Sequence, residues 1–425
     1  MRKTWLCLLV AALVGTSLPT VATAQAADAP ATIHGFDPAR LERIESTLQR
    51  YVDEGVIAGA VALVMRDGEV VYEEAVGWSD REARRPMRTD DIFRIASQTK
   101  AITSTAVMML VEEGKIALDD PVSRWLPSFD STTVAVRTDS GVRIEPARRK
   151  ITIRDLLTHT AGISYGGEPH VAEAYQRHDL GYGEAYGWYT ADDEEPICQK
   201  MDRLGTLPFV RQPGEAFVYG YNTDILGCVV ERASGLPLDQ FIRERITEPL
   251  GMTDTHFYLP REKRDRLATV YTPGEDGKVL RAPDNARGQG HYVDGPRVSF
   301  AGGAGLLSTA RDYARFLEAM RRGGELDGVR ILAPQTVALM TTNQIGDLRG
   351  EGIGFGLGFE TIDRMGASGF SSVGSFGWSG AYGTAYEVDP QYGLVRVLML
   401  QVVPFSNNAV RDAFETAVYQ ALVEP

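Results

Sequence analysis

The segment Ile95-Ala96-Ser97-Gln98-Thr99-Lys100 places a serine hydroxyl and a lysine amine three residues apart. Residues i and i+3 share one face of a helix, so Ser97 and Lys100 can face the same cleft. A lysine that is desolvated by a pocket wall can take the proton of a serine and make it a nucleophile. Gly114 is placed to end the predicted helix. The apolar stripe of that helix comprises Ala101, Ile102, Ala106, Val107, Leu110 and Val111.

The S-x-x-K pattern alone is weak evidence for catalysis. Ordinary serine and lysine usage gives roughly one such pattern in a chain of this length. The plain alternative is a serine that caps a helix and a lysine that faces solvent. The rest of the sequence must therefore decide between the two interpretations.

Composition limits the possible functions. The chain has 425 residues, is 44% hydrophobic and carries a formal net charge of −13. These values are typical of a globular protein with one large domain or two smaller ones. The basic run Arg148-Arg149-Lys150 is short and reads as a solvated loop. An acidic chain without a basic stripe argues against nucleic acid as a partner.

The first 26 residues resemble a secretory signal peptide. Arg2 and Lys3 precede a mostly apolar run from Trp5 to Val14, and small residues follow it. That run is too short for a comfortable membrane span, so we expect cleavage and export to a periplasm or beyond the cell. Cys198 and Cys228 remain in the mature chain, and the sequence leaves open whether they are paired or free.

Both ends of the chain predict strands and a terminal helix. Asp37-Pro38 is a helix-start signal, and Asp67-Gly68 is a hairpin signal between two strand-like segments. The simplest architecture pairs the two ends in one antiparallel sheet flanked by helices, an α/β (α+β) fold. The strand-like segments are Ala60 to Met65, Glu69 to Ala75, Thr384 to Val388 and Leu394 to Val402.

The middle of the chain is helical and loop-rich in this interpretation. We expect an α/β domain from residues 34–125 and 290–425, with residues 126–289 as a mainly helical inserted lobe. The active-site cleft would lie between the two parts.

Two further motifs accompany Ser97. They are Tyr219-Gly220-Tyr221-Asn222 and Trp378-Ser379-Gly380-Ala381. With these motifs the chain resembles the serine β-lactamase and penicillin-binding superfamily. The resemblance is strongest to the class C-like branch that includes family VIII carboxylesterases, and it spans about residues 40 to 405. It implies a β-lactamase-like fold and a serine hydrolase without a metal or cofactor.

The resemblance also implies roles for single residues. Ser97 would be the nucleophile, Lys100 its base, and Tyr219 a phenol that shares their proton network. The oxyanion hole would consist of the backbone N–H groups of Ser97 and Ala381. The implied substrate-binding residues are Trp378, Ser379, Gly380 and Tyr221.

Two departures from the superfamily pattern concern the substrate. Tyr221 stands where β-lactamases of this class have an asparagine, and Asn222 comes one position late. Trp378 stands where they have a lysine that helps to hold a carboxylate. Both changes favour a neutral, apolar ester as the small-molecule substrate. The alternatives are a β-lactam or D-amino-acid peptide on the same site, and a non-catalytic penicillin-recognising protein that acylates and stalls.

Gly162-Ile163-Ser164-Tyr165-Gly166 provides a competing nucleophile. It matches the G-x-S-x-G elbow of α/β-hydrolases, with His256 or His291 as the possible later histidine. The elbow requires a strand before the serine and a helix after it, whereas a helix-like segment precedes Ser164.

The histidines show no close metal-binding pair. We expect His159 to be a structural hydrogen-bonding residue behind the site. Four aromatic residues either line the substrate pocket or pack the middle lobe, and the sequence does not distinguish these: Tyr165, Tyr182, Tyr186 and Trp188.

Overall fold

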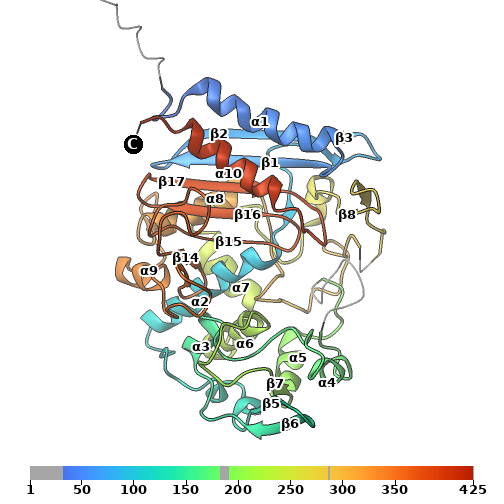
Figure 1. Ribbon diagram of the computed structural model, residues 1–425, viewed down its shortest axis with the longest axis vertical. Helices are drawn as coiled ribbons and strands as arrows, with labels where there is room; N and C mark the ends of the chain where they lie inside the picture. The colour runs from blue at the N-terminus through green and yellow to red at the C-terminus, as the bar shows by residue number, and fades with distance from the viewer. Residues whose placement is uncertain (1–31, 182–190, 286–287, 425) are drawn as a thin grey trace, which may run out of the picture.

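The computed structural model describes residues 32–181, 191–285 and 288–424. The expected signal peptide and the aromatic residues Tyr182, Tyr186 and Trp188 lie outside these residues. The described part contains an eight-stranded antiparallel sheet that both chain ends build, as predicted (Figure 1). In spatial order its strands are β13 (Ile353–Phe355), β14 (Glu360–Ile362), β15 (Phe376–Ser379), β16 (Ala385–Asp389), β17 (Leu394–Met399), β1 (Gly59–Arg66), β2 (Glu69–Asp80) and β3 (Arg85–Pro86).

The join between the chain ends is the pairing of β1 with β17, in which Val61 lies opposite Met399. The predicted hairpin connects β1 to β2. Asp67 and Gly68 both have positive φ angles, 53° and 92°, as the tight turn of a two-residue hairpin requires. Every residue of β1 is buried. A strand with both faces covered should be apolar throughout, and the sequence GAVALVMR is apolar up to its last residue.

Helices cover both faces of the sheet. Helices α1 (Pro38–Asp53) and α10 (Ala409–Ala421) lie side by side across one face (Figure 1). Alternate residues of β1 point to the two faces. Ala60, Ala62 and Val64 pack in the cluster that contains the apolar residues of α1 and α10. Val61, Leu63 and Met65 pack in the cluster that contains α8 (Ala310–Arg321).

Much of the segment that follows α2 (Thr99–Glu112) forms the lower part of Figure 1. It contains a β-hairpin, Thr133–Thr138 with Gly141–Pro146, that the sequence analysis did not predict. The alternating valines of its first strand fit a half-buried strand, whereas its second strand is mostly exposed. The elements of this segment are β5 (Thr133–Thr138), β6 (Gly141–Pro146), α3 (Ile153–Leu157), α4 (Ala172–Gln176), α5 (Ile197–Leu204), β7 (Pro208–Phe209), α6 (Asn222–Ser234) and α7 (Leu238–Ile242).

Several smaller elements complete the described chain. Thr152 and Asp155 form a capping box at the start of α3, and Thr309 caps α8. The backbone N–H of Tyr271 donates to Gln401 beside the large sheet, over 2.9 Å. The remaining elements include β4 (Phe93–Arg94), β8 (Tyr271–Pro273), β9 (Val279–Arg281), β10 (Leu307–Ser308), β11 (Glu325–Leu326), β12 (Val329–Arg330), α9 (Pro334–Met340) and a π-helical turn (Arg243–Thr247).

Helix α2 (Thr99–Glu112) lies between the sheet and α6. Its residues from Thr99 to Leu110 are all buried, so it is a core helix rather than a surface helix with one apolar face. A short 3₁₀ turn, Ala96–Gln98, leads directly into it. The fold therefore places Ser97 on a short turn at the N-terminal end of α2.

Candidate active site

Ser97 and Lys100 lie together as the sequence predicts. Ser97 is partly exposed in the 3₁₀ turn, while Lys100 is only 2% exposed at the start of α2. The Lys100 Nζ lies 3.2 Å from the Ser97 Oγ. This is within reach for direct proton transfer. The arrangement rules out the interpretation of Lys100 as a solvent-facing lysine.

The turn that carries Ser97 has an unusual backbone. Ala96 has a φ angle of 43°, in the left-handed region that L-residues with a side chain rarely adopt. Gly380, at the end of β15, lies so close to the carbonyl of Ile95 that a Cβ there would collide with it. The Tyr313 hydroxyl also donates to the Gln98 carbonyl over 2.8 Å. Tertiary contacts on both sides therefore hold Ser97 in one position.

The Lys100 amine contacts three further groups. It donates to the Gly303 carbonyl over 2.7 Å and to the Tyr165 hydroxyl over 3.0 Å. The ring centroid of Tyr219 lies 4.7 Å from Nζ. With Ser97 Oγ, the amine has three oxygen atoms within hydrogen-bond distance and an aromatic face beside it.

Tyr219 lies at the site, but its hydroxyl does not bond Lys100. Instead it accepts a hydrogen bond from Trp378 Nε1 over 3.1 Å. The two rings pack with centroids 5.3 Å apart. Tyr219 thus connects two of the three predicted motifs, and its ring covers Lys100.

Tyr165 supplies the phenol that bonds Lys100. Sequence reasoning considered this residue only as pocket lining or as packing. Tyr165 comes 65 residues after Lys100 in the sequence, and no local pattern around it indicates that its hydroxyl bonds the Lys100 amine. The only signal near Tyr165 was the G-x-S-x-G pattern around Ser164, and that pattern indicates the nucleophile of an α/β-hydrolase instead.

Tyr221 and Asn222 both face the protein interior. Tyr221 is 2% exposed, packs edge-on against Tyr165 with centroids 4.9 Å apart, and accepts a hydrogen bond from the Gly181 N–H. The Asn222 amide donates to His159 Nδ1 over 2.9 Å. These positions make Tyr221 a support for Tyr165 and leave the Asn222 amide turned away from the cleft.

The third motif lies beside Ser97 and belongs to the same side of the site. Trp378 and Ser379 are partly exposed at the end of β15, Gly380 is buried, and Ala381 is exposed. The contact between Gly380 and Ile95 brings this strand end next to the Ser97 turn. Ala381 directly follows Gly380, so it belongs to the strand end that packs against the Ser97 turn.

His159 lies behind Tyr219, in the position expected of a structural residue. Its ring packs 4.8 Å from that of Tyr219, and it is buried. Burial, together with the charges of Lys100 and Arg349, holds the pKa of His159 well below its usual value. The imidazole is therefore neutral and accepts the hydrogen bond from the Asn222 amide.

Arg349 is a cation near the site that the sequence analysis missed. Its guanidinium lies over the ring of Trp378, 5.0 Å from the centroid, and over Phe217, 4.8 Å away. It also forms an ion pair with Glu360 over 2.6 Å. Because Glu360 balances its charge, Arg349 does not take the place of the lysine that β-lactamases of this class have at the position of Trp378.

Ser164 does not have the surroundings of a nucleophile. It is 3% exposed, and its Oγ donates to Glu168 over 2.6 Å and accepts from the Gly166 N–H. The short helix α3 precedes it, in place of the strand that the elbow requires. The G-x-S-x-G pattern is therefore a buried turn.

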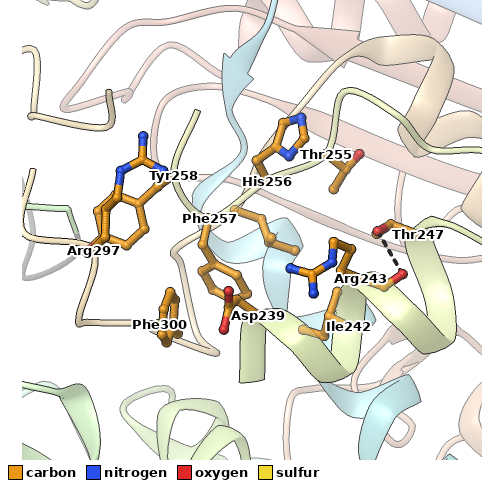
Figure 2. A pocket seen from close by; sticks show the side chains of 11 residues that line it. Asp239, Ile242, Arg243, Thr247, Thr255, His256, Phe257, Tyr258, Arg297 and Phe300 are labelled. Carbon is orange, nitrogen blue, oxygen red and sulfur yellow. Dashed lines mark hydrogen bonds between the residues drawn. The ribbon is translucent and has the colours of Figure 1, made fainter. Parts of the chain in front are cut away.

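Neither candidate histidine lies at Ser164. His291 pairs with Asp192 over 2.8 Å. His256 lies 3.1 Å from Lys263 Nζ and lines a separate cavity of about 260 Å³, between α7 and the turn that carries Arg297 and Phe300 (Figure 2). Burial is the main cause that lowers the pKa of His256 to about 4.

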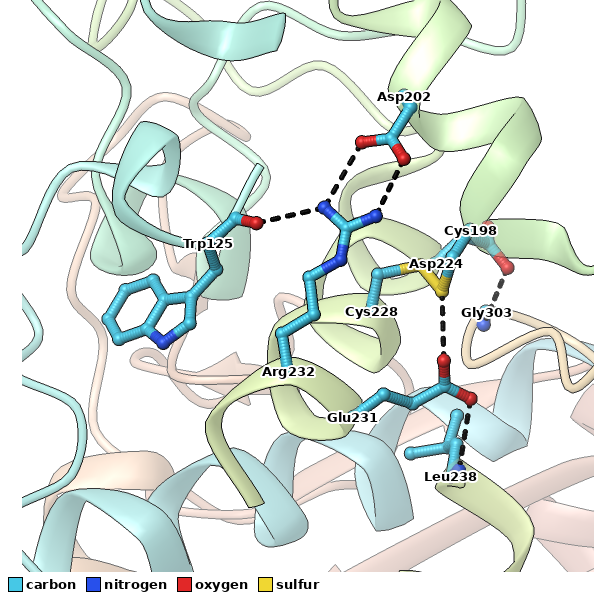
Figure 3. Close-up of a disulfide and its surroundings, with 9 residues drawn as sticks. All are labelled: Trp125, Cys198, Asp202, Asp224, Cys228, Glu231, Arg232, Leu238 and Gly303. Carbon is cyan, nitrogen blue, oxygen red and sulfur yellow. Dashed lines mark hydrogen bonds and ion pairs between the residues drawn. A yellow bond between two sulfur atoms is a disulfide. The ribbon is translucent and has the colours of Figure 1, made fainter. Parts of the chain in front are cut away.

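Cys198 and Cys228 form a disulfide, which settles the pairing that the sequence left open. It joins α5 to α6, with the two Cα atoms 5.5 Å apart (Figure 3). Asp224 lies in the first turn of α6, and Cys228 lies one helical turn after it. The bridge therefore fixes the helix that begins directly after Tyr219 and Tyr221.

Across the described ranges, we find no group of three His, Cys, Asp or Glu side chains arranged to hold a metal ion. The same residues include no helix with the length and apolarity needed to cross a membrane.

Comparison with known proteins identifies the class. Residues 44–420 match the family model described as Beta-lactamase. The chain is 38% identical over 383 residues to an uncharacterised protein of Mycobacterium tuberculosis, covering 86% of this chain and 90% of that one. It is 35% identical over 413 residues to Esterase EstB of Burkholderia gladioli, covering 93% and 99%.

A solved structure gives the same result. The structure of EstCE1, titled a hydrolase with promiscuous acyltransferase activity, matches with a TM-score of 0.74 and 30% identity, covering 91% of this chain and 99% of that one. The chain therefore belongs to the beta-lactamase family. Within it, the chain is an enzyme of the family VIII esterase-like branch, a serine hydrolase of the esterase or acyltransferase type.

Proposed function

We propose that the chain is an exported carboxylesterase that hydrolyses neutral esters through a covalent acyl-enzyme on Ser97. The observation that carries this proposal is the 3.2 Å contact between Ser97 Oγ and the buried amine of Lys100. A buried amine can exchange a proton only with the few groups that surround it. The partly exposed hydroxyl beside it is the group that a substrate can reach.

In the acylation step, Ser97 Oγ attacks the ester carbonyl as Lys100 takes its proton. The backbone N–H groups of Ser97 and Ala381 stabilise the oxyanion, and the loss of one such donor typically costs about 3 kcal/mol of barrier. The proton then passes to the leaving alcohol as the carbon–oxygen bond breaks. Tyr219 and Tyr165 flank Lys100 and provide phenols for this transfer.

Deacylation repeats these steps with water. Water attacks the acyl carbonyl while the Lys100 group accepts its proton. Ser97 leaves with a proton and the carboxylic acid is released. Hydrolysis therefore returns Ser97 and Lys100 to their starting states, and these steps use no cofactor.

The walls of the site support a neutral substrate. Trp378 presents an indole where a β-lactamase of this class has a lysine, and the nearby guanidinium of Arg349 is occupied by Glu360. We assign Trp378, Ser379 and Gly380 to the acyl or alcohol side of the substrate. Tyr221 contributes indirectly, through its contact with Tyr165.

Export is supported by two independent features. The first 26 residues have the pattern of a signal peptide, and the mature chain contains the disulfide between Cys198 and Cys228. Disulfides form and persist mainly in oxidising compartments.

The test compares p-nitrophenyl butyrate with the β-lactam nitrocefin on the folded mature enzyme. We expect kcat/KM for the ester to exceed that for nitrocefin by about 100-fold or more, equivalent to about 2.7 kcal/mol. Faster turnover of nitrocefin would move the assignment to a β-lactamase. A stable adduct on Ser97 without turnover of either compound would indicate a protein that acylates and stalls.

A further inference from the structure

Asp224 is a buried carboxylate that the mechanism above does not use. It lies in the first turn of α6 and has 0% exposure. Its Oδ1 accepts a hydrogen bond from the Gly303 N–H over 2.9 Å (Figure 3). The carbonyl of the same glycine accepts the 2.7 Å hydrogen bond from Lys100 Nζ. Gly303 is thus held between the carboxylate and the catalytic amine.

The fit around Gly303 is close. A Cβ at this position would lie 2.5 Å from Asp224 Oδ2, so the carboxylate rests against the bare Cα of the glycine. Within the described residues, Oδ2 has no hydrogen-bond partner. A buried carboxylate oxygen without a partner is costly, and such groups in a native structure call for a functional explanation.

Asp224 is ionised at neutral pH although it is buried. Desolvation raises the pKa of Asp224 to about 6, while the positive charge of Lys100 and the Gly303 N–H oppose that rise. The other titratable or charged side chains around Lys100 are Tyr165, Tyr219 and neutral His159, with Arg349 farther out and paired to Glu360. Asp224 therefore supplies negative charge next to the amine.

We propose that Asp224 is a positioning residue for Lys100: it fixes the amine through Gly303 and balances the ammonium that forms when Lys100 takes the Ser97 proton. This inference rests on the proposed function, because it requires Lys100 to act as the base. The chain places the carboxylate on α6, five residues after Tyr219, so one segment provides both a phenol and the counter-charge.

The test is Asp224→Asn, which keeps an oxygen acceptor for Gly303 but removes the charge. Without the carboxylate, the ammonium that forms in the acylation step has no negative charge beside Gly303 to balance it. We expect the ascending limb of the pH profile of kcat/KM to move down by about 1 pH unit, as for the loss of a nearby opposite charge. We also expect kcat/KM at the optimum to fall about 10-fold, because the remaining base is weaker.

The matched control is Asp312→Asn. Asp312 is also a buried aspartate whose pKa burial raises to about 6, but it bonds the Asp254 N–H and the Thr255 hydroxyl, away from Lys100. This variant should keep the wild-type profile. Thermal unfolding of both variants identifies any loss of fold.

A second readout separates the failure of this inference from failure of the proposed function. The rate at which p-nitrophenyl diethyl phosphate labels Ser97 is measured against pH, and the labelled residue is found by mass spectrometry. If the wild type is not labelled at Ser97, the proposed function fails. If Ser97 is labelled but the folded Asp224→Asn profile overlays the wild type, or is lowered evenly at every pH, only the role of Asp224 is overturned.

Two further variants apply if Asp224→Asn does not fold. Asp224→Glu keeps the charge, and its ascending limb should stay within about 0.3 pH unit of the wild type, well below the 1-unit shift expected for a lost charge. Gly303→Ala pushes the Asp224 carboxylate away and should move the ascending limb of the kcat/KM profile to lower pH. A limb that does not move in folded Gly303→Ala would contradict the proposal.

Discussion

The two walls of the active site are built in different ways. One wall carries Ser97 and Lys100 on a turn and a core helix, with Trp378 on the neighbouring strand end. The other wall comes from the chain between α2 and α6, where Tyr165 and Tyr219 lie in irregular segments before α4 and α6. The first wall follows from local spacing, whereas the second exists only through long-range packing and a disulfide. The nucleophile is thus encoded locally, and its proton network is not.

The largest expected effect tests the first wall. Ser97→Ala should lower ester kcat/KM by about 10⁴-fold or more, because no acyl-enzyme can form. Ser164→Ala is its control and should keep activity within about 3-fold, since Ser164 bonds only Glu168 and Gly166 among the described groups, and should cost about 1 kcal/mol of stability. The reverse result would place the nucleophile in the second wall and contradict the comparison.

The next effect separates the two phenols of the second wall. Tyr219→Phe leaves Trp378 Nε1 without its acceptor and should lower kcat/KM about 100-fold. Tyr165→Phe removes one of the acceptors of Lys100 and should lower it about 10-fold. Parallel steady-state kinetics give the ranking. A larger loss in Tyr165→Phe would show that the main proton route runs through Tyr165.

The disulfide tests how the second wall is held. Replacing Cys198 and Cys228 by serine should lower the free energy of unfolding by about 3.6 kcal/mol, the value that loop-closure entropy gives for a separation of 30 residues. Urea unfolding with and without reductant measures it. The double variant should not respond to reductant, and a wild type that is equally indifferent would mean that the bridge contributes little.

The smallest effect concerns Asp312 in α8, whose carboxylate bonds the Asp254 N–H and the Thr255 hydroxyl rather than a group of either wall. Asp312 has a pKa of about 6 when folded, above the usual 3.8. The folded state therefore holds a proton that the unfolded chain has already released, and stability falls as pH rises from about 4 through 6. Between pH 4.5 and 7 this loss is about 2 kcal/mol. Asp312→Asn should flatten this dependence, as measured by urea unfolding at pH 4.5 and 7. An unchanged slope would assign it to other groups.

Much of the fold could be predicted because its signals are short-range. The hairpin at Asp67-Gly68, the cap at Asp37 and the capping box at Thr152 are each contained within a few residues. The pairing of Ser97 with Lys100 likewise needs only helical spacing. The missed β5–β6 hairpin also had a local signal, the alternation of Val134 and Val136, which the helical interpretation of this lobe overrode.

The rest of the site depends on contacts that no local pattern records. Tyr165 reaches Lys100, Asp224 reaches Gly303, and Arg349 reaches Trp378 only after the chain has folded. A sequence can suggest that such side chains are polar and unusual, but not which partner they meet. The disulfide was open for the same reason, because a cysteine in an apolar helix suits a buried thiol equally well.

The pairing of β1 with β17 has a consequence for biosynthesis. β1 leaves the ribosome early, but its partner is among the last segments made, on the order of tens of seconds later at 5–20 residues per second. Until then β1 has an unpaired edge and α1 lacks its neighbour α10. The central sheet therefore cannot close until β17 has been made. For the export proposed above such a delay is an advantage, because a translocation channel can thread a chain that has not yet closed its core.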